Sequence, residues 1–234
     1  MTGELQHKEL GRVMVNIRQN SRHVSARWKK GLVSLNVPNG VCLPELNRIL
    51  DDLTPRLLAT RPEVSYFPGQ ELCFPYVDFV IRSQSFAPSK ILATASVPVS
   101  SVEVGSDWNF DLDTTSRAIS DMLCKTARKV AHKVLVPRAR ELAERIGRYP
   151  VGWTISGGHR TLGQCTATGV ISLSYILVFL PVDLCDYVIY HELAHLSEMN
   201  HSPRFHQLLD SYLDGREASL VRRLQSYTWP VLRK

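Results

Sequence analysis

The sequence has no hydrophobic run long enough to cross a membrane, which excludes a helical transmembrane protein. Its longest apolar stretch, residues 176–182 with their neighbours, has only the length of a strand. The first residues, Met-Thr-Gly-Glu-Leu-Gln-His-Lys, contain no hydrophobic core of the kind that secretory signal peptides carry. We therefore expect no membrane partner.

Cysteine is also scarce, and what there is forms no pattern. The five cysteines are an odd number, and their spacing matches neither a disulfide framework nor a zinc knuckle. They stand at positions 42, 73, 124, 165 and 185. We expect reduced thiols and a cytoplasmic protein. The chain shows no internal sequence repeat and no low-complexity tract.

What the sequence does have is the length and composition of an ordinary globular protein. Its 234 residues suit one large domain or two small ones. The net charge of +6 permits contact with nucleic acid, but dense basic runs interleaved with aromatic residues are missing. A solvated basic surface is the favoured interpretation, so nucleic acid is only weakly supported as a partner. The sequence does not indicate an oligomeric state.

The N-terminal half is rich in strand patterns. Apolar residues alternate with polar ones over residues 13–17, 24–28 and 33–37, which predicts a meander of short antiparallel strands. An amphipathic helix is expected over Leu43–Leu58, bent or ended near Pro55. Strand patterns then return, first at Val64 and Tyr66, and last as two short strands between Val97 and Val104.

The C-terminal half alternates helix and strand. Helical spacing begins at Thr115, and Pro137 should kink or split that helix. A strand over 151–155, a polar loop and an apolar segment over 170–180 precede a further helix that Pro181 opens. We expect an α+β protein with a β-rich domain over residues 1–110 and a second domain over residues 111–234.

The motif that points to chemistry is His191-Glu192-Leu193-Ala194-His195. Two histidines four residues apart project from one face of a helix, where a single metal ion can accept both imidazoles. Glu192 lies between them and can reach a water on that metal without being a ligand. This is the His-Glu-x-x-His arrangement of zinc peptidases, in which the glutamate is the general base.

Three residues compete for the place of third ligand. We favour His201, because Asn200 can end the helix in the left-handed region and Ser202-Pro203 resembles the start of a new helix, so that the chain turns back. Glu198 lies on the same helical face but about 4.5 Å further along the axis than His195. His206 falls inside the next helix and is the reserve candidate.

The loop before the metal-binding helix contains further polar candidates. His159 and Arg160 could stabilise an oxyanion, although a plain polar loop explains them equally well. Cys165 is better explained as a small buried side chain than as a nucleophile or ligand.

Taken together, these residues resemble the YgjP-like metallopeptidases, which are relatives of the SprT-like zincins. The resemblance is carried by the segment Asp186–Leu196, by Asn200-His201-Ser202 and by Phe205. Upstream it includes Gly163-x-Cys165, Gly169-x-Ile171-x-Leu173 and the Leu180-Pro181 junction, and more weakly Arg18–Arg27 and Val37-Pro38. The chain departs from the family pattern at Leu162 and His206, where the family usually has tryptophan.

The resemblance implies a zincin-like catalytic domain in which helix, sheet and active-site helix follow one another. It implies three histidine ligands, which map onto His191, His195 and His201, and a general base that maps onto Glu192. By analogy with other zincins, the strand Val170–Ser174 is the candidate edge for pairing with an extended peptide.

We therefore expect a zinc metallopeptidase that hydrolyses peptide bonds through a metal-activated water, with Glu192 as general base. Two alternatives remain open. One is an SprT-like protease acting on DNA-associated proteins, which salt-dependent binding to DNA would reveal. The other is a zinc-binding module without turnover, which the intact Glu192 disfavours.

Overall fold

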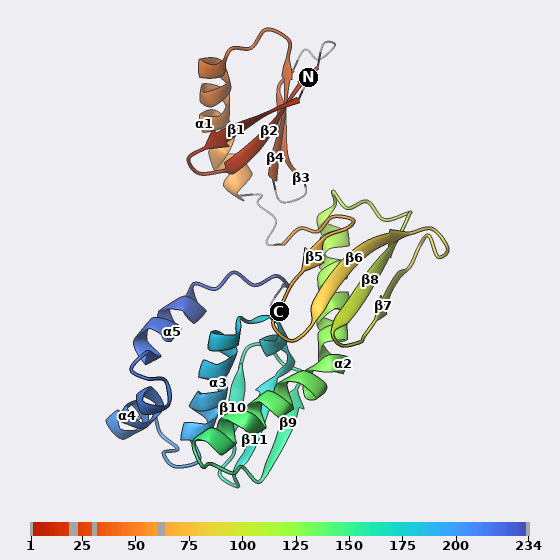
Figure 1. The fold of residues 1–234 in the computed structure, drawn as a ribbon. Coiled ribbons are helices and arrows are strands. Elements are labelled where there is room, and N and C mark those ends of the chain that lie inside the picture. The colour runs from red at the N-terminus through yellow and green to blue at the C-terminus, as the bar shows by residue number, and fades with distance from the viewer. Residues whose placement is uncertain (1, 19–22, 30–31, 60–63, 233–234) are drawn as a thin grey trace. The chain divides into compact units, whose positions relative to one another are not determined.

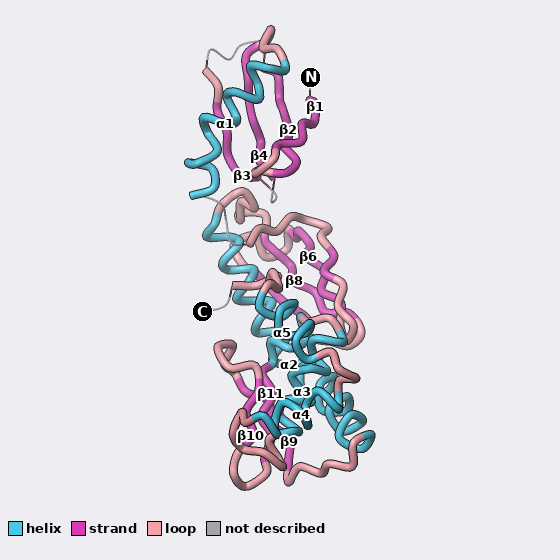
Figure 2. Tube along the Cα trace, turned by 90° about the vertical axis from the view of Figure 1, so that its left-hand side faces the viewer, coloured by secondary structure: helices cyan, strands magenta, loops and turns pink. Residues whose placement is uncertain are grey.

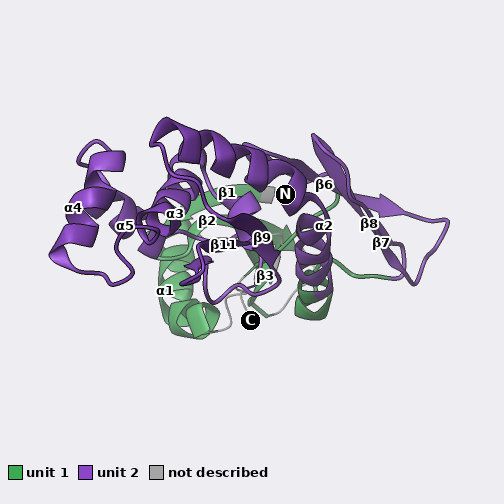
Figure 3. Cartoon of the chain, turned by 90° about the horizontal axis from the view of Figure 1, so that it is seen from below, with its two compact units in different colours: residues 1–68, 108–117 green, residues 69–107, 118–234 purple. Residues whose placement is uncertain are grey.

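The computed structural model describes residues 2–18, 23–29, 32–59 and 64–232. These residues form an α+β protein with three small sheets, five α-helices and one 3-10 helix (Figure 1). Contacts between Cα atoms divide the chain into two compact units, residues 1–68 with 108–117 and residues 69–107 with 118–234 (Figure 3). Residues 69–107 thus group with the C-terminal half. The division into domains over residues 1–110 and 111–234 stays a prediction.

The first unit is a four-stranded sheet with one helix. Its elements are β1 (Thr2–His7), β2 (Gly11–Arg18), β3 (Ser25–Lys29), β4 (Leu32–Pro38) and α1 (Leu43–Ala59). The strand order is β1-β2-β4-β3, and β2 runs parallel to β4. The predicted meander is therefore wrong in its strand order, although the antiparallel pairing of β3 with β4 is confirmed. The two central strands, β2 and β4, supply the fully buried Val13, Val33 and Leu35.

Helix α1 begins and ends close to the predicted positions. Leu46, Leu50 and Leu57 bury one face of it in the core of the first unit. Pro55 lies inside the helix and does not end it. The last turn is held because Leu57 is buried and its carbonyl accepts a 2.7 Å hydrogen bond from Trp28 Nε1.

The second unit begins with a sheet of the same topology. Its strands are β5 (Glu71–Leu72), β6 (Asp78–Gln84), β7 (Ile91–Thr94) and β8 (Val99–Gly105), in the order β5-β6-β8-β7. As in the first unit, the two central strands are parallel and each outer pair is antiparallel. Each sheet is followed by a helix, so a ββββα arrangement occurs twice although the sequence shows no repeat.

Two strand predictions in this region are wrong. Val64 and Tyr66 lie outside the strands that the described residues form. The segment expected to form two short strands forms one, β8, because all seven of its residues pair with β6. Its polar Ser100 and Ser101 therefore lie within the ladder and do not interrupt it.

The remaining elements position the candidate site. They are α2 (Asp113–Arg145), β9 (Gly152–Ser156), β10 (Gly163–Cys165), β11 (Val170–Ser174), the 3-10 helix η1 (Tyr175–Phe179), α3 (Val182–Ala194), α4 (Pro203–Tyr212) and α5 (Glu217–Gln225). Pro137 lies within α2, which is not split. Figures 1 and 2 both show α3 beside the small sheet of β9, β10 and β11.

The third sheet contradicts the expected place for substrate pairing. Its order is β10-β11-β9, so Val170–Ser174 is the central strand. It is hydrogen-bonded to β10 on one side and to β9 on the other. The edge strand of this sheet that lies beside α3 is β10, not Val170–Ser174.

Helix α3 is buried on nearly all sides, and two of its acidic residues, Asp183 and Asp186, pair with arginines of neighbouring helices. Arg138 of α2 holds Asp186 through two hydrogen bonds, one of them Nε to Oδ1 at 2.9 Å. Arg223 of α5 pairs with Asp183 in the first turn. The preceding 3-10 helix is fully buried, and Phe179 packs against Phe79 with ring centroids 5.2 Å apart.

None of the helices formed by the described residues combines the length and apolar character required to span a bilayer.

Candidate metal centre

The first two histidines lie at the C-terminal end of α3. The helix ends at Ala194, and His195 is its C-terminal cap, with its N–H bonded back to the carbonyl of His191 at 3.4 Å. The two Nε2 atoms are 3.3 Å apart. Asn200 was expected to end the helix in the left-handed region, and this is wrong. Among the described residues other than glycine, a positive φ occurs at Asp214 and not at Asn200, so Asn200 does not adopt the left-handed conformation.

The chain turns immediately after the helix. The amides of Ser197 and Glu198 both donate to the carbonyl of Ala194 at 3.0 Å, which closes a tight turn. Ser202 then caps α4 by accepting a 3.3 Å hydrogen bond from Phe205 N, and Pro203 occupies the first position of that helix, as predicted. This turn brings His201 Nε2 to 3.0 Å from His191 Nε2.

Of the three candidates for a third ligand, His201 is the one that reaches the pair. Glu198 contributes its backbone instead, since its carbonyl lies 3.0 Å from Nδ1 of His195. That contact holds the proton on Nδ1 and leaves Nε2 with a lone pair. His206 points elsewhere and lies 2.7 Å from the carboxylate of Glu217.

The geometry of the three imidazoles fits a metal ion. Their nitrogens lie within 4.8 Å of one another. In a tetrahedral zinc site with bonds of about 2.0–2.1 Å, neighbouring nitrogens are about 3.3 Å apart, close to the two separations given above. Burial, with the neighbouring histidines, lowers the pKa of His191 to about 4, and burial also lowers that of His195. Both rings are therefore neutral at neutral pH, which is the form that binds metal.

Phe205 supports the cluster from one side. Its fully buried ring stacks on His195 with centroids 4.6 Å apart and meets His191 and His201 edge-on at 4.9 and 4.8 Å. In the sequence, Phe205 stands out only as one of the residues that carry the family resemblance. Its contact with all three histidines depends on the turn between the two helices and was not predicted.

Glu192 lies buried beside the histidines, against the edge strand. Only 5% of its surface is exposed, and burial raises its pKa to about 7. A Cβ atom at Gly163 of β10 would lie 2.5 Å from Oε1 of Glu192 and 2.6 Å from its Cγ. The carboxylate thus occupies space that any side chain at residue 163 would take. A glycine inside a strand pattern is the signal for such a close approach.

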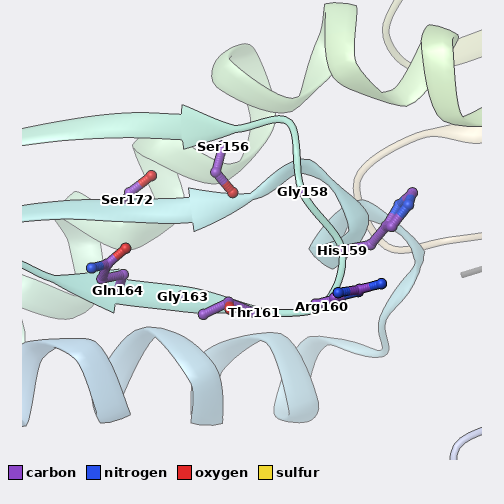
Figure 4. A pocket seen from close by; sticks show the side chains of 8 residues that line it. All are labelled: Ser156, Gly158, His159, Arg160, Thr161, Gly163, Gln164 and Ser172. Carbon is purple, nitrogen blue, oxygen red and sulfur yellow. The ribbon is translucent and has the colours of Figure 1, made fainter. Parts of the chain in front are cut away.

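The other polar candidates lie in and around the loop between β9 and β10. His159 Nδ1 is 2.5 Å from the hydroxyl of Tyr175, so that ring is held by a buried side chain. Arg160 is exposed and lines a pocket on the third sheet (Figure 4). Cys165 is a half-buried free thiol whose pKa is raised by burial and by the charge of Glu192. The other four cysteines are also free.

Comparison with protein families gives one match. A model described as "YgjP-like, metallopeptidase domain" covers residues 22–226, which is most of the chain. This is the family that the sequence resembles. Neither the curated proteins nor the solved structures contain a match. A metallopeptidase domain implies a metal ion and a peptide or protein substrate, and the three histidines are residues that could hold such an ion.

We predict that Gly163→Ala destabilises the protein, because its Cβ would overlap the buried carboxylate of Glu192. Overpacking of this kind costs about 1–3 kcal/mol. Gly158→Ala is the matched control, since a Cβ there meets nothing within 4 Å. Denaturant unfolding of both variants measures the difference. Equal stabilities would show that Glu192 moves aside at no cost.

We also predict that Glu192→Gln stabilises the metal-free protein increasingly as pH rises. Burial raises the pKa of Glu192 from its ordinary 4.5 to about 7, so the folded state favours the protonated form. The stability that this group contributes is present below pH 4.5 and is lost as pH rises through 7. The variant should therefore gain about 3 kcal/mol relative to wild type between pH 4.5 and 8. Denaturant unfolding in chelator measures this, with Glu144→Gln on the exposed side of α2 as control. A difference independent of pH would contradict the prediction.

Proposed function

The chain belongs to the YgjP-like metallopeptidase family, and on that premise we propose that it is a zinc peptidase with its catalytic residues on α3 and the following turn. The observation that carries the proposal is the meeting of three imidazole nitrogens beside a buried carboxylate. His191, His195 and His201 would hold the ion, and Glu192 would be the general base. Three imidazoles suit zinc better than the harder divalent cations, which prefer oxygen ligands.

The chemistry divides between the ion and Glu192. When bound, the ion supplies a Lewis acid that acidifies water and polarises the peptide carbonyl. Glu192 accepts the proton of the attacking water and then delivers it to the nitrogen of the leaving amine. A carboxylate whose pKa lies near the working pH is suited to both transfers. Its burial against Gly163 restricts its rotamers, which favours a fixed position for the base.

We propose a zincin-like arrangement in which β10 receives the substrate. It is the outermost strand of its sheet, and Gly163 brings it against the general base. An extended peptide paired with the free edge of β10 would lie along α3. In this proposal β10 takes the role that was expected for Val170–Ser174.

Glu192→Gln tests the catalytic assignment. The amide has the size of the carboxylate but cannot accept a proton, so we expect peptide hydrolysis to fall by about 10²–10⁴-fold while zinc content is retained. The measurement is turnover of unstructured peptides together with metal analysis of wild type and variant. Equal activity would remove Glu192 from the role of base. Zinc binding without turnover in either protein would favour a non-catalytic zinc module.

His201→Ala tests the ligand set, with His206→Ala as the matched control. Loss of a partner that only orients a ligand costs about 10–100-fold in metal affinity, and loss of a ligand should cost more. We therefore expect zinc affinity to fall more than about 100-fold in His201→Ala and to change little in His206→Ala. Competition with a chelating dye measures both. Undiminished affinity in His201→Ala would exclude it as a ligand.

A further inference from the structure

A polar pocket lies on the face of the third sheet that is turned away from Glu192. Its volume is about 450 Å³, and it is lined by Ser156, Ser172 and Gln164 from the strands and by the loop that joins β9 to β10 (Figure 4). Gly163 also lines it, and the same residue touches Glu192. A Cβ at Gly163 would point at Glu192, whereas its neighbour Gln164 and the paired Ser172 point to the other face, so the pocket and the carboxylate lie on opposite faces of β10.

The charge that lines the pocket is positive. Arg160 lines it, and none of its described lining residues is acidic. Among the described residues Arg160 makes no ion pair or hydrogen bond, whereas Arg138, Arg145 and Arg223 of the same unit each bind a carboxylate. The guanidinium of Arg160 therefore keeps all its donors for a group from outside the chain.

The loop that carries Arg160 is fixed from behind at three points. Ser174 Oγ donates to the carbonyl of Gly158 at 2.5 Å, and Arg128 donates to the carbonyl of Gly157 at 2.9 Å. His159 meets the hydroxyl of Tyr175, and both Tyr175 and Ser174 are fully buried. Figure 4 shows His159 and Arg160 projecting from the same end of the pocket. A fixed backbone reduces the ordering cost of binding through a long side chain.

We propose that this pocket is a subsite for a carboxylate of the peptide substrate, with Arg160 as its anchor. The inference rests on the proposed peptidase function, because a peptide offers anions only as acidic side chains or as its C-terminal group. A guanidinium binds a carboxylate through two parallel hydrogen bonds. The hydroxyl groups of Ser156, Thr161 and Ser172 and the amide of Gln164 add neutral donors. The pocket should therefore prefer acidic peptides to neutral or basic ones.

The test is direct binding of peptides to the zinc-loaded Glu192→Gln protein, which needs no turnover. The probes are pairs that differ only as Glu against Gln at each position, and pairs with a free or an amidated C-terminus. Since a hydrogen bond to a charged group contributes about 1.5–3 kcal/mol, we expect at least tenfold tighter binding of the acid in one series. The series that responds identifies the side-chain or the terminal carboxylate.

Arg160→Gln should abolish that preference, and Arg82→Gln is its control. Arg82 is an exposed arginine on β6 and is not among the residues lining the pocket, so its substitution changes net charge by the same amount. Equal binding of acid and amide, or an equal loss in both variants, would overturn the subsite. So would failure of every peptide to bind.

The same experiment separates this inference from the function on which it rests. Peptide hydrolysis by wild type without an acidic preference would keep the peptidase and overturn the subsite. An acidic preference that depends on Arg160, in a protein that hydrolyses none of the peptides, would support the subsite and contradict the peptidase.

Discussion

Three imidazoles whose nitrogens lie within 4.8 Å of one another are the constraint on which the C-terminal part of this structure depends. Side chains without opposite charges do not gather in this way unless the backbone on both sides is fixed. Here His195 caps the end of α3, the next turn closes on the carbonyl of Ala194, and Ser202 caps the start of α4. Phe205 then fills the space behind all three rings. The site is therefore assembled from a helix end and a helix start.

The surroundings of α3 explain how a helix with a polar site can lie inside an apolar core. Its acidic residues away from the site, Asp183 and Asp186, are each paired with an arginine from another helix. Glu192 has no such partner among the described residues and meets the backbone of Gly163 instead. Burial without a partner raises its pKa, so the group that we propose as general base is the one left uncompensated.

The sequence identified the chemical groups better than their surroundings. The spacing of His191 and His195 and the cap at Ser202 are local patterns, and the structure has both. The pairing of strands is not local, because alternation of apolar residues is the same in parallel and antiparallel strands. Hence β2 was expected to pair with β3 and β11 was expected at an edge, whereas β2 pairs in parallel with β4 and β11 is central. The contact of Gly163 with Glu192 joins residues 29 positions apart and could not be read from either segment. The twofold ββββα topology left no trace in the sequence, since it depends on strand order alone.

X-ray absorption at the zinc edge of the zinc-loaded protein tests the central claim most directly, because it reports the number and kind of atoms around the metal. We predict three imidazole nitrogens at about 2.0–2.1 Å and no sulfur at about 2.3 Å. The half-buried Cys165 near Glu192 makes the sulfur distance the informative one. A spectrum that requires a sulfur neighbour, or fewer than three imidazoles, would contradict a site formed by His191, His195 and His201.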